Sequence, residues 1–127
     1  MERTGRDPIH GFGDLEVYQR GYRLALAVHK ESNGWREAGY HTIGDQLRGA
    51  AWSVPSNIAE GYGRKIFEKD FKRMLITALG SVNEVLVFLD AARDLGWLND
   101  GLHATWRDEY ELLARQLQTL IQRWQTY

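Results

Sequence analysis

The residues whose types could do chemistry lie mainly in one segment, residues 53–64, where polar side chains interrupt a helical rhythm. If this segment is helical, its polar residues at steps of three and four share one face. Two further polar residues take the same spacing on a later predicted helix, so the set could form a polar ligand pocket. The five residues of that set are Asn57, Glu60, Arg64, Ser81 and Glu84.

The same side chains also admit a structural hypothesis, in which they satisfy one another and fix the register of two packed helices. An unsatisfied buried polar group costs on the order of 1 to 3 kcal/mol, so a polar contact between helices needs partners. Arg48 is a candidate partner for one of the carboxylates. We favour this hypothesis over the ligand pocket. The predicted network comprises Arg48, Ser53, Asn57, Glu60, Ser81 and Glu84.

Two backbone features accompany this polar set. Pro55 has no amide hydrogen and its ring clashes with the carbonyl of Ala51, so we expect the second helix to kink there. Nearby serine hydroxyls can bond the freed carbonyls. Gly80, beside Ser81, predicts a close approach of another helix.

Patterns typical of enzymes are missing from the sequence. A carboxylate-bridged metal bundle needs Glu-x-x-His pairs, and none of the four histidines has that spacing. Asp100 stands three residues before His103, but a helix cap explains it better. There is no nucleophile elbow, P-loop or dinucleotide fingerprint, and the absence of cysteine excludes thiolate chemistry. We therefore expect no enzymatic activity, no metal and no cofactor.

Basic residues gather near the start of the third predicted helix. Residues 61–80 carry five cations against two carboxylates, whereas residues 81–127 carry four against seven. Such a patch could engage the phosphates of RNA or DNA, with Tyr62 and Phe67 available to stack bases. The predicted nucleic-acid-binding residues are Arg64, Lys65, Lys69, Lys72 and Arg73.

An ordinary solvated helix face is the alternative for this basic patch. Glu68 and Lys72 stand at i, i+4, the spacing of a helix-stabilising ion pair. Phe67 is better placed to staple the helix start than to stack a base.

Four amphipathic segments must position these residues, and nothing alternates with the period of a strand. The first is predicted to begin at an Asp14 cap and to end at Asn33-Gly34, where a glycine can adopt a left-handed conformation. Asn99 or Asp100 caps the last. The predicted helices span residues 14–32, 41–63, 67–96 and about 100–127.

Short connections between long helices force antiparallel neighbours. The sequence therefore predicts an all-α fold, an antiparallel up-down-up-down four-helix bundle over residues 14–127. A flexible segment, residues 1–13, precedes it.

Apolar residues exceed what one bundle core can bury. The predicted core stripe of the first helix is Leu15, Tyr18, Tyr22, Ala25, Leu26 and His29. The apolar residues beside the predicted stripes are Val17, Leu24, Val28, Trp52, Ile76, Val87 and Ile121. Surplus of this kind is common at oligomer interfaces, although aromatic side chains can also lie flat on a surface. We favour self-association.

Composition points to one ordinary globular domain. The chain has 127 residues, a formal net charge of −1 and 26% charged residues, so no global field favours nucleic acid or a membrane. No apolar run approaches the roughly 18 to 20 residues that cross a bilayer, and the first residues lack a signal-peptide core. We expect a cytoplasmic protein without a membrane partner.

The small and polar positions, together with the apolar rhythm, carry a family resemblance over roughly residues 12–98. The matching positions are Leu15 to Tyr18, Gln46 to Arg48, Ala50-Ala51, Ser53-Val54, Asn57 to Gly61, Gly63-Arg64, Phe71, Leu75, Ala78, Gly80-Ser81, Glu84 and Leu95-Gly96. They resemble the bacterial four-helix-bundle family of 23S ribosomal RNA intervening-sequence proteins. Gly49 departs from the family pattern, which usually shows a basic residue there.

This resemblance implies an assembly. The bundle is similar to accessory proteins of diversity-generating retroelements, which form five-membered rings and bind RNA and a reverse transcriptase. The implied protein is a non-enzymatic homo-oligomer, a ring of five. Its implied partners are RNA or DNA and a protein such as a reverse transcriptase. A protein-interaction module without nucleic-acid binding is the alternative.

Overall fold

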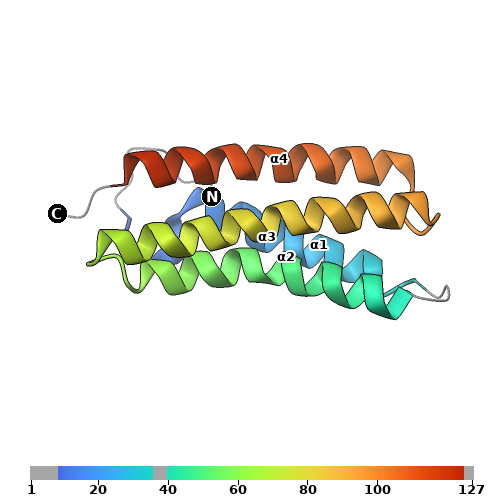
Figure 1. Ribbon diagram of the computed structural model, residues 1–127, viewed down its shortest axis with the longest axis horizontal. Helices are drawn as coiled ribbons and strands as arrows, with labels where there is room; N and C mark the ends of the chain where they lie inside the picture. The colour runs from blue at the N-terminus through green and yellow to red at the C-terminus, as the bar shows by residue number, and fades with distance from the viewer. Residues whose placement is uncertain (1–8, 36–39, 125–127) are drawn as a thin grey trace.

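A computed structural model describes residues 9–35 and 40–124 of the chain as a bundle of long helices. The elements are a 3-10 helix, η1 (Phe12–Asp14), and the α-helices α1 (Glu16–Ser32), α2 (Tyr40–Tyr62), α3 (Glu68–Asp94) and α4 (Asp100–Arg123). Successive helices run in opposite directions along one long axis (Figure 1). Within the described ranges there is no strand. The predicted all-α four-helix bundle is confirmed.

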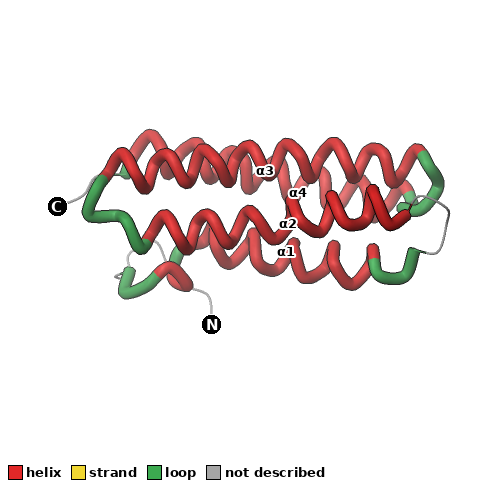
Figure 2. Tube along the Cα trace, turned by 60° about the horizontal axis from the view of Figure 1, so that its bottom comes forward, coloured by secondary structure: helices red, strands yellow, loops and turns green. Residues whose placement is uncertain are grey.

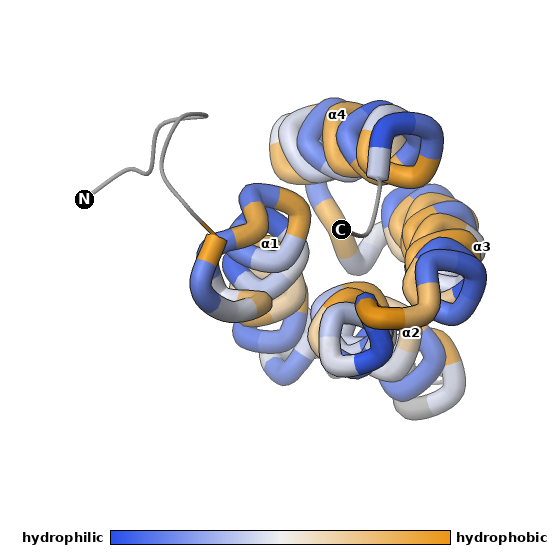
Figure 3. Tube along the Cα trace, turned by 90° about the vertical axis from the view of Figure 1, so that its left-hand side faces the viewer, coloured by the Kyte–Doolittle hydropathy of each residue, from blue (hydrophilic) through white to orange (hydrophobic). Residues whose placement is uncertain are grey.

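The order of the helices around the bundle decides which surfaces can meet. α2 packs against both α1 and α3, and α4 packs against α3 and α1. Viewed along the axis, α1 and α3 therefore occupy opposite corners (Figure 3). The tube in Figure 2 shows the short turn that joins α2 to α3 at one end of the bundle.

The first helix begins two residues later than predicted. Asp14 does not cap it, because Asp14 ends η1 and its Oδ2 accepts hydrogen bonds from the backbone N of His10 and Gly11 at 2.8 and 3.3 Å. Leu15 is the N-cap of α1. Of the predicted flexible segment 1–13, residues 1–8 lie outside the described residues, and η1 begins within the remainder.

Of the other predicted helix caps and breaks, some are confirmed and some are not. The Asn99 side chain accepts a hydrogen bond from the Leu102 N at 2.8 Å, so the predicted cap of α4 is confirmed. Among the described residues the left-handed glycine is Gly96, with φ +84°, rather than Gly34. α2 runs without a break across Pro55, and the kink there stays a prediction.

The core-facing side of α1 differs in part from the predicted stripe, of which Leu15 and Ala25 are buried as predicted. Val17, Leu24 and Val28 are at most 4% exposed, whereas Tyr22 and Leu26 are 44% and 37% exposed. The cause is Gly21, where an added Cβ would lie 3.2 Å from Val54 Cγ1 of α2. Because Gly21 has no side chain, the face of α1 that carries Val17, Leu24 and Val28 can pack against α2. The face that carries Tyr22 and Leu26 is then exposed.

The core side of α3 is formed by one stripe of residues at helical spacing. Its fully buried positions include Phe71, Leu75, Ala78, Val82, Val85, Leu89 and Ala92. Ile76 and Val87 lie outside, at 56% and 61% exposure, as their place beside the stripe indicated.

The close helix approach occurs at Gly61 and not at Gly80. A Cβ on Gly61 would lie 2.7 Å from Met74 Cβ and 3.1 Å from Phe71 Cδ1. A Cβ on Gly80 would meet nothing within 4 Å, so the close approach predicted there is wrong. The last turn of α2 and the first turns of α3 thus converge immediately after their connecting turn.

We predict that Gly61→Ala destabilises the fold by about 1 to 3 kcal/mol, because the new methyl overlaps the base of Met74 rather than a flexible side-chain tip. Urea unfolding followed by circular dichroism measures the change. Gly49→Ala is the matched control on α2, since a Cβ there meets nothing within 4 Å and alanine favours a helix by up to about 1 kcal/mol. Equal stability of the two variants would contradict a close contact at Gly61.

Candidate functional site

Three of the predicted network residues join α2 to α3 through uncharged hydrogen bonds. Asn57 Nδ2 donates to the Ser53 backbone O at 2.8 Å and to Ser53 Oγ at 2.9 Å. Ser53 Oγ and Ser81 Oγ are 2.8 Å apart, and Ser81 Oγ donates to Thr77 O at 3.3 Å. Because each hydroxyl has one hydrogen, the Ser53 hydroxyl donates to Ser81. The bonds run in one direction across the helix contact, from Asn57 to Thr77.

The other three residues of that predicted network, Arg48, Glu60 and Glu84, form no hydrogen bond with these three in the part of the chain that the structure describes. Arg48 contacts Ser32 Oγ at 2.8 Å and Asp45 Oδ1 at 2.7 Å, so it joins α2 to α1. Residues 48 and 53 are five apart and therefore point about 140° away from each other around the helix. Glu60 pairs with Arg64 at 3.1 Å, and both are largely exposed.

A shallow open cavity of about 320 Å³ lies beside the α2–α3 hydrogen bonds. Its lining residues are Asp45, Gln46, Gly49, Ala50, Ser53, Ser81 and Glu84. The two hydroxyls in this lining are already engaged with each other, and Glu84 is exposed without a partner among the described residues. The lining of this cavity, made mainly of small residues and two carboxylates, therefore suits packing against another molecule better than catalysis.

Ion pairs neutralise much of the predicted basic patch. Arg64, Lys72 and Arg73 lie 3.1, 2.9 and 3.7 Å from the carboxylates of Glu60, Glu68 and Asp70. Lys69 is exposed and pairs with no carboxylate in the described part of the chain. When Glu60 is included, residues 60–73 carry five cations and three carboxylates, which is less positive than predicted.

Lys65 and the two aromatic residues of this patch take different positions. Lys65 Nζ donates to the Tyr62 hydroxyl at 2.8 Å and lies 4.2 Å from the ring centroid. Tyr62 is only 8% exposed and meets Phe71 edge to face, so its ring is not free to stack a base. Phe67 is 65% exposed and caps α3 in an extended conformation, so the predicted staple is wrong.

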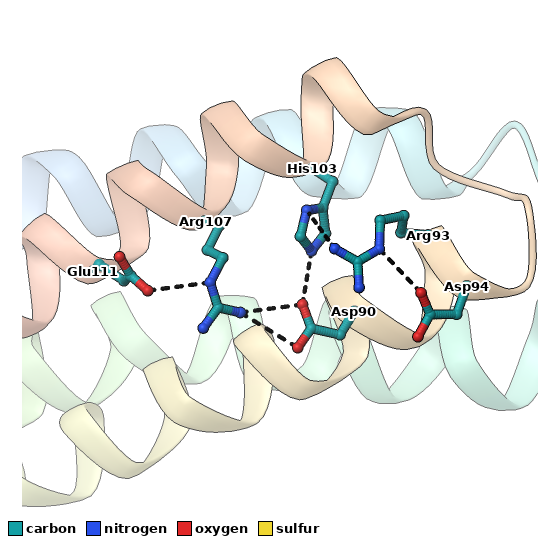
Figure 4. A network of polar contacts seen from close by, with 6 residues as sticks. All are labelled: Asp90, Arg93, Asp94, His103, Arg107 and Glu111. Carbon is teal, nitrogen blue, oxygen red and sulfur yellow. Dashed lines mark hydrogen bonds and ion pairs between the residues drawn. The ribbon is translucent and has the colours of Figure 1, made fainter.

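A second polar network, not foreseen from the sequence, joins α3 to α4 (Figure 4). His103 Nε2 lies 2.7 Å from Asp90 Oδ1, and its Nδ1 lies 3.4 Å from Arg93 NH1. Arg107 NH1 donates to both oxygens of Asp90, at 3.1 and 3.3 Å. An arginine can only donate, so Nδ1 accepts and Nε2–H is the donor to Asp90.

Antiparallel hairpin geometry creates this network. Asp90 lies four residues before the end of α3, and His103 lies three residues after the start of α4. Their similar distances from the turn could have predicted this contact from the sequence. Spacing along the sequence instead relates His103 to Asp100, three residues before it. The hydrogen bond from His103, together with the charge of Arg107, holds the pKa of Asp90 below its ordinary value of 3.8. Burial opposes this shift.

A row of aromatic side chains runs along α1 and α2. The ring centroids of Phe12 and Tyr18 are 4.8 Å apart, those of Tyr18 and Tyr22 6.0 Å, and those of Tyr22 and Trp52 5.4 Å. Trp52 Nε1 donates to His29 Nδ1 at 3.0 Å. We call these five residues the aromatic strip. Tyr18 and Tyr22, in the middle of the strip, were predicted from the sequence to lie in the core.

We predict that Asp90→Asn lowers the stability by about 1 kcal/mol at neutral pH, because the charge facing Arg107 and His103 is lost. The folded pKa lies below the unfolded one, so the wild-type carboxylate stabilises the fold above about pH 4 and stops doing so as the pH falls through the folded pKa. The difference between variant and wild type should therefore shrink in acid.

Urea midpoints from pH 2.5 to 7 measure this difference. Asp94→Asn is the matched control on the same helix, because Asp94 is 67% exposed and its one ion pair within residues 9–35 and 40–124 is with its neighbour Arg93. A pH-independent loss for Asp90→Asn, equal to that of the control, would contradict an ionic role for Asp90.

Comparisons with known proteins agree with this architecture. A protein with unknown function from the S23 ribosomal protein family of Bacteroides thetaiotaomicron has a similar solved structure, with a TM-score of 0.73. The two are 18% identical, and the match covers 83% of this chain and 97% of that one, so the likeness shows a shared fold. No curated protein matches the chain significantly. The family model described as 23S rRNA-intervening sequence protein matches residues 13–119, which reach from η1 into α4, and the chain therefore belongs to that family.

Proposed function

We propose that the chain is a non-enzymatic assembly module that associates with further copies of itself. The observation that carries this proposal is the apolar character of α3 on its outer side. Ile76 and Val87 are 56% and 61% exposed in the middle of the helix. An 18-residue window of α3 is apolar enough to span a membrane by composition alone, yet 28% of it is buried. A helix that is apolar all round is usually buried all round.

A ring of five is the assembly we propose. Its support is the similarity of this type of bundle to the ring-forming accessory proteins of diversity-generating retroelements. A partner protein such as a reverse transcriptase would bind the finished ring. We propose the cytoplasm as its compartment, since a chain without cysteine suits reducing conditions.

The polar groups support a role without catalysis. The Ser53–Ser81 and Asp90–His103 contacts are satisfied within the bundle, and Arg107 is further held by Glu111 at 3.1 Å. In the described residues there is no group of three or more acidic, histidine or cysteine side chains placed to hold a metal. These groups join helices to one another.

We predict a molar mass of about 74 kDa for the assembled chain, five times the 14.7 kDa of one copy. Light scattering coupled to size exclusion, at micromolar concentrations, measures it. A monomer would refute the assembly module. A different closed number would refute only the ring of five.

Nucleic-acid binding at the turn between α2 and α3 is a second candidate function. Lys69 is unpaired there and Phe67 is 65% exposed, the combination of cation and accessible ring that suits an unpaired base. The nearby ion pairs reduce the attraction of one copy. A ring would present the patch several times and recover affinity through multivalency.

We predict that the wild type shifts a labelled structured RNA at low salt, with affinity falling steeply as salt rises. Lys69→Glu should weaken that binding several-fold. Arg115→Glu is the matched control, because Arg115 is an exposed arginine on α4 with no ion pair among the described residues. If both reversals weaken binding equally, the turn is not the site. If the wild type causes no shift, the protein-interaction module without nucleic-acid binding is favoured.

A further inference from the structure

We propose that copies of the chain join head to tail, with the outer face of α3 of one copy on the aromatic strip of the next. The inference rests on the proposed function, because it names the two surfaces of that self-association. It adds that these surfaces are different, so that each copy uses both at once.

The outer face of α3 is shaped to receive another surface. Ile76, Gly80, Asn83 and Val87 follow at steps of four, three and four and so share one side of the helix. Gly80 has open space where a side chain would stand, which leaves a flat surface between two apolar side chains. We call these four residues the outer α3 face.

The charge beside the outer α3 face is negative. Residues 74–92 contain no lysine or arginine. Glu84 is exposed and has no partner among the described residues, whereas Asp45 across the cavity is 72% exposed and pairs with Arg48 at 2.7 Å. The nearest cation on this side of α3 is Arg73, one turn before Ile76, which lies 3.7 Å from Asp70. A partner surface should therefore combine apolar and basic side chains.

The aromatic strip meets both requirements. Phe12 and Tyr22 are 41% and 44% exposed, and their rings are held by neighbouring rings at 4.8 to 6.0 Å. Rigid aromatic side chains lose little conformational entropy on binding, which makes them effective anchors. Lys30 is exposed without an ion pair among the described residues, and Arg23 is 63% exposed with a partner, Glu109, 3.7 Å away.

The position of the two surfaces favours a head-to-tail contact. α1 and α3 occupy opposite corners of the bundle, so one copy can use its outer α3 face and its aromatic strip at the same time (Figure 3). Pairing two outer α3 faces would bring like carboxylates together, whereas pairing unlike surfaces brings Glu84 toward the basic border of the strip. A contact between unlike surfaces propagates around an axis and closes as a ring if the rotation permits.

A complementation experiment tests this arrangement. Val87→Glu places a charge on the outer α3 face, and Tyr22→Glu places one on the aromatic strip. Each variant alone should run as a 14.7 kDa monomer in light scattering. Mixed in equal amounts, they should form a dimer of about 29 kDa and nothing larger, because one intact copy of each surface remains. Gln118→Glu, at an exposed position on α4, is the control and should keep the wild-type mass.

The outcomes separate this inference from the proposed function. A wild-type monomer, including one that floats with lipid vesicles, overturns both, since α3 would then be covered by lipid or by nothing. A wild-type oligomer whose mass survives either single substitution overturns only the head-to-tail contact. So do two monomeric variants that fail to dimerise when mixed, because the intact outer α3 face of one variant then does not bind the intact aromatic strip of the other. Circular dichroism of each variant establishes that its helices are retained.

Discussion

The contact between α2 and α3 is the constraint on which the other features depend. Gly61 brings the two helices together directly after their turn, and the Ser53–Ser81 hydrogen bond fixes their register farther along. Sliding one helix by a turn would strand these hydroxyls in a half-buried contact, at a cost on the order of 1 to 3 kcal/mol. The polar bonds therefore specify one alignment, while the apolar core supplies most of the stability.

Once α3 is held in this rotation, its outward side is determined. The side that includes Phe71 and Leu89 faces the core, and the opposite side carries Ile76 and Val87. A similar consequence follows for α1, where the contact of Gly21 with Val54 turns the tyrosines outward. The outer α3 face and the aromatic strip thus arise from how the helices pack, on helices at opposite corners of the bundle.

Electrostatics gives the ends of the bundle different characters. At the turn between α2 and α3, carboxylates one helical turn from the cations form local pairs, so most of the positive charge is compensated. At the opposite end, Asp90 collects His103 and Arg107 from α4 and closes the second hairpin. Both arrangements stabilise hairpins, and Ile66, Phe67 and Lys69 are among the residues that remain accessible at the first.

The sequence by itself determined the helix count, the approximate helix ends, a cap of α4 at Asn99 or Asp100, and the family. Periodicity and capping are local, and they depend on residues within a few turns. It did not determine which of two overlapping stripes of α1 faces inward, because Tyr18, Tyr22 and Leu26 follow the helical period as well as Val17, Leu24 and Val28 do. Only the tertiary structure decided this, through a close approach at a residue without a side chain. The tertiary structure also decided that Arg48 bonds Ser32 of α1 and that His103 bonds Asp90 of α3. Such contacts depend on how whole helices are rotated against one another.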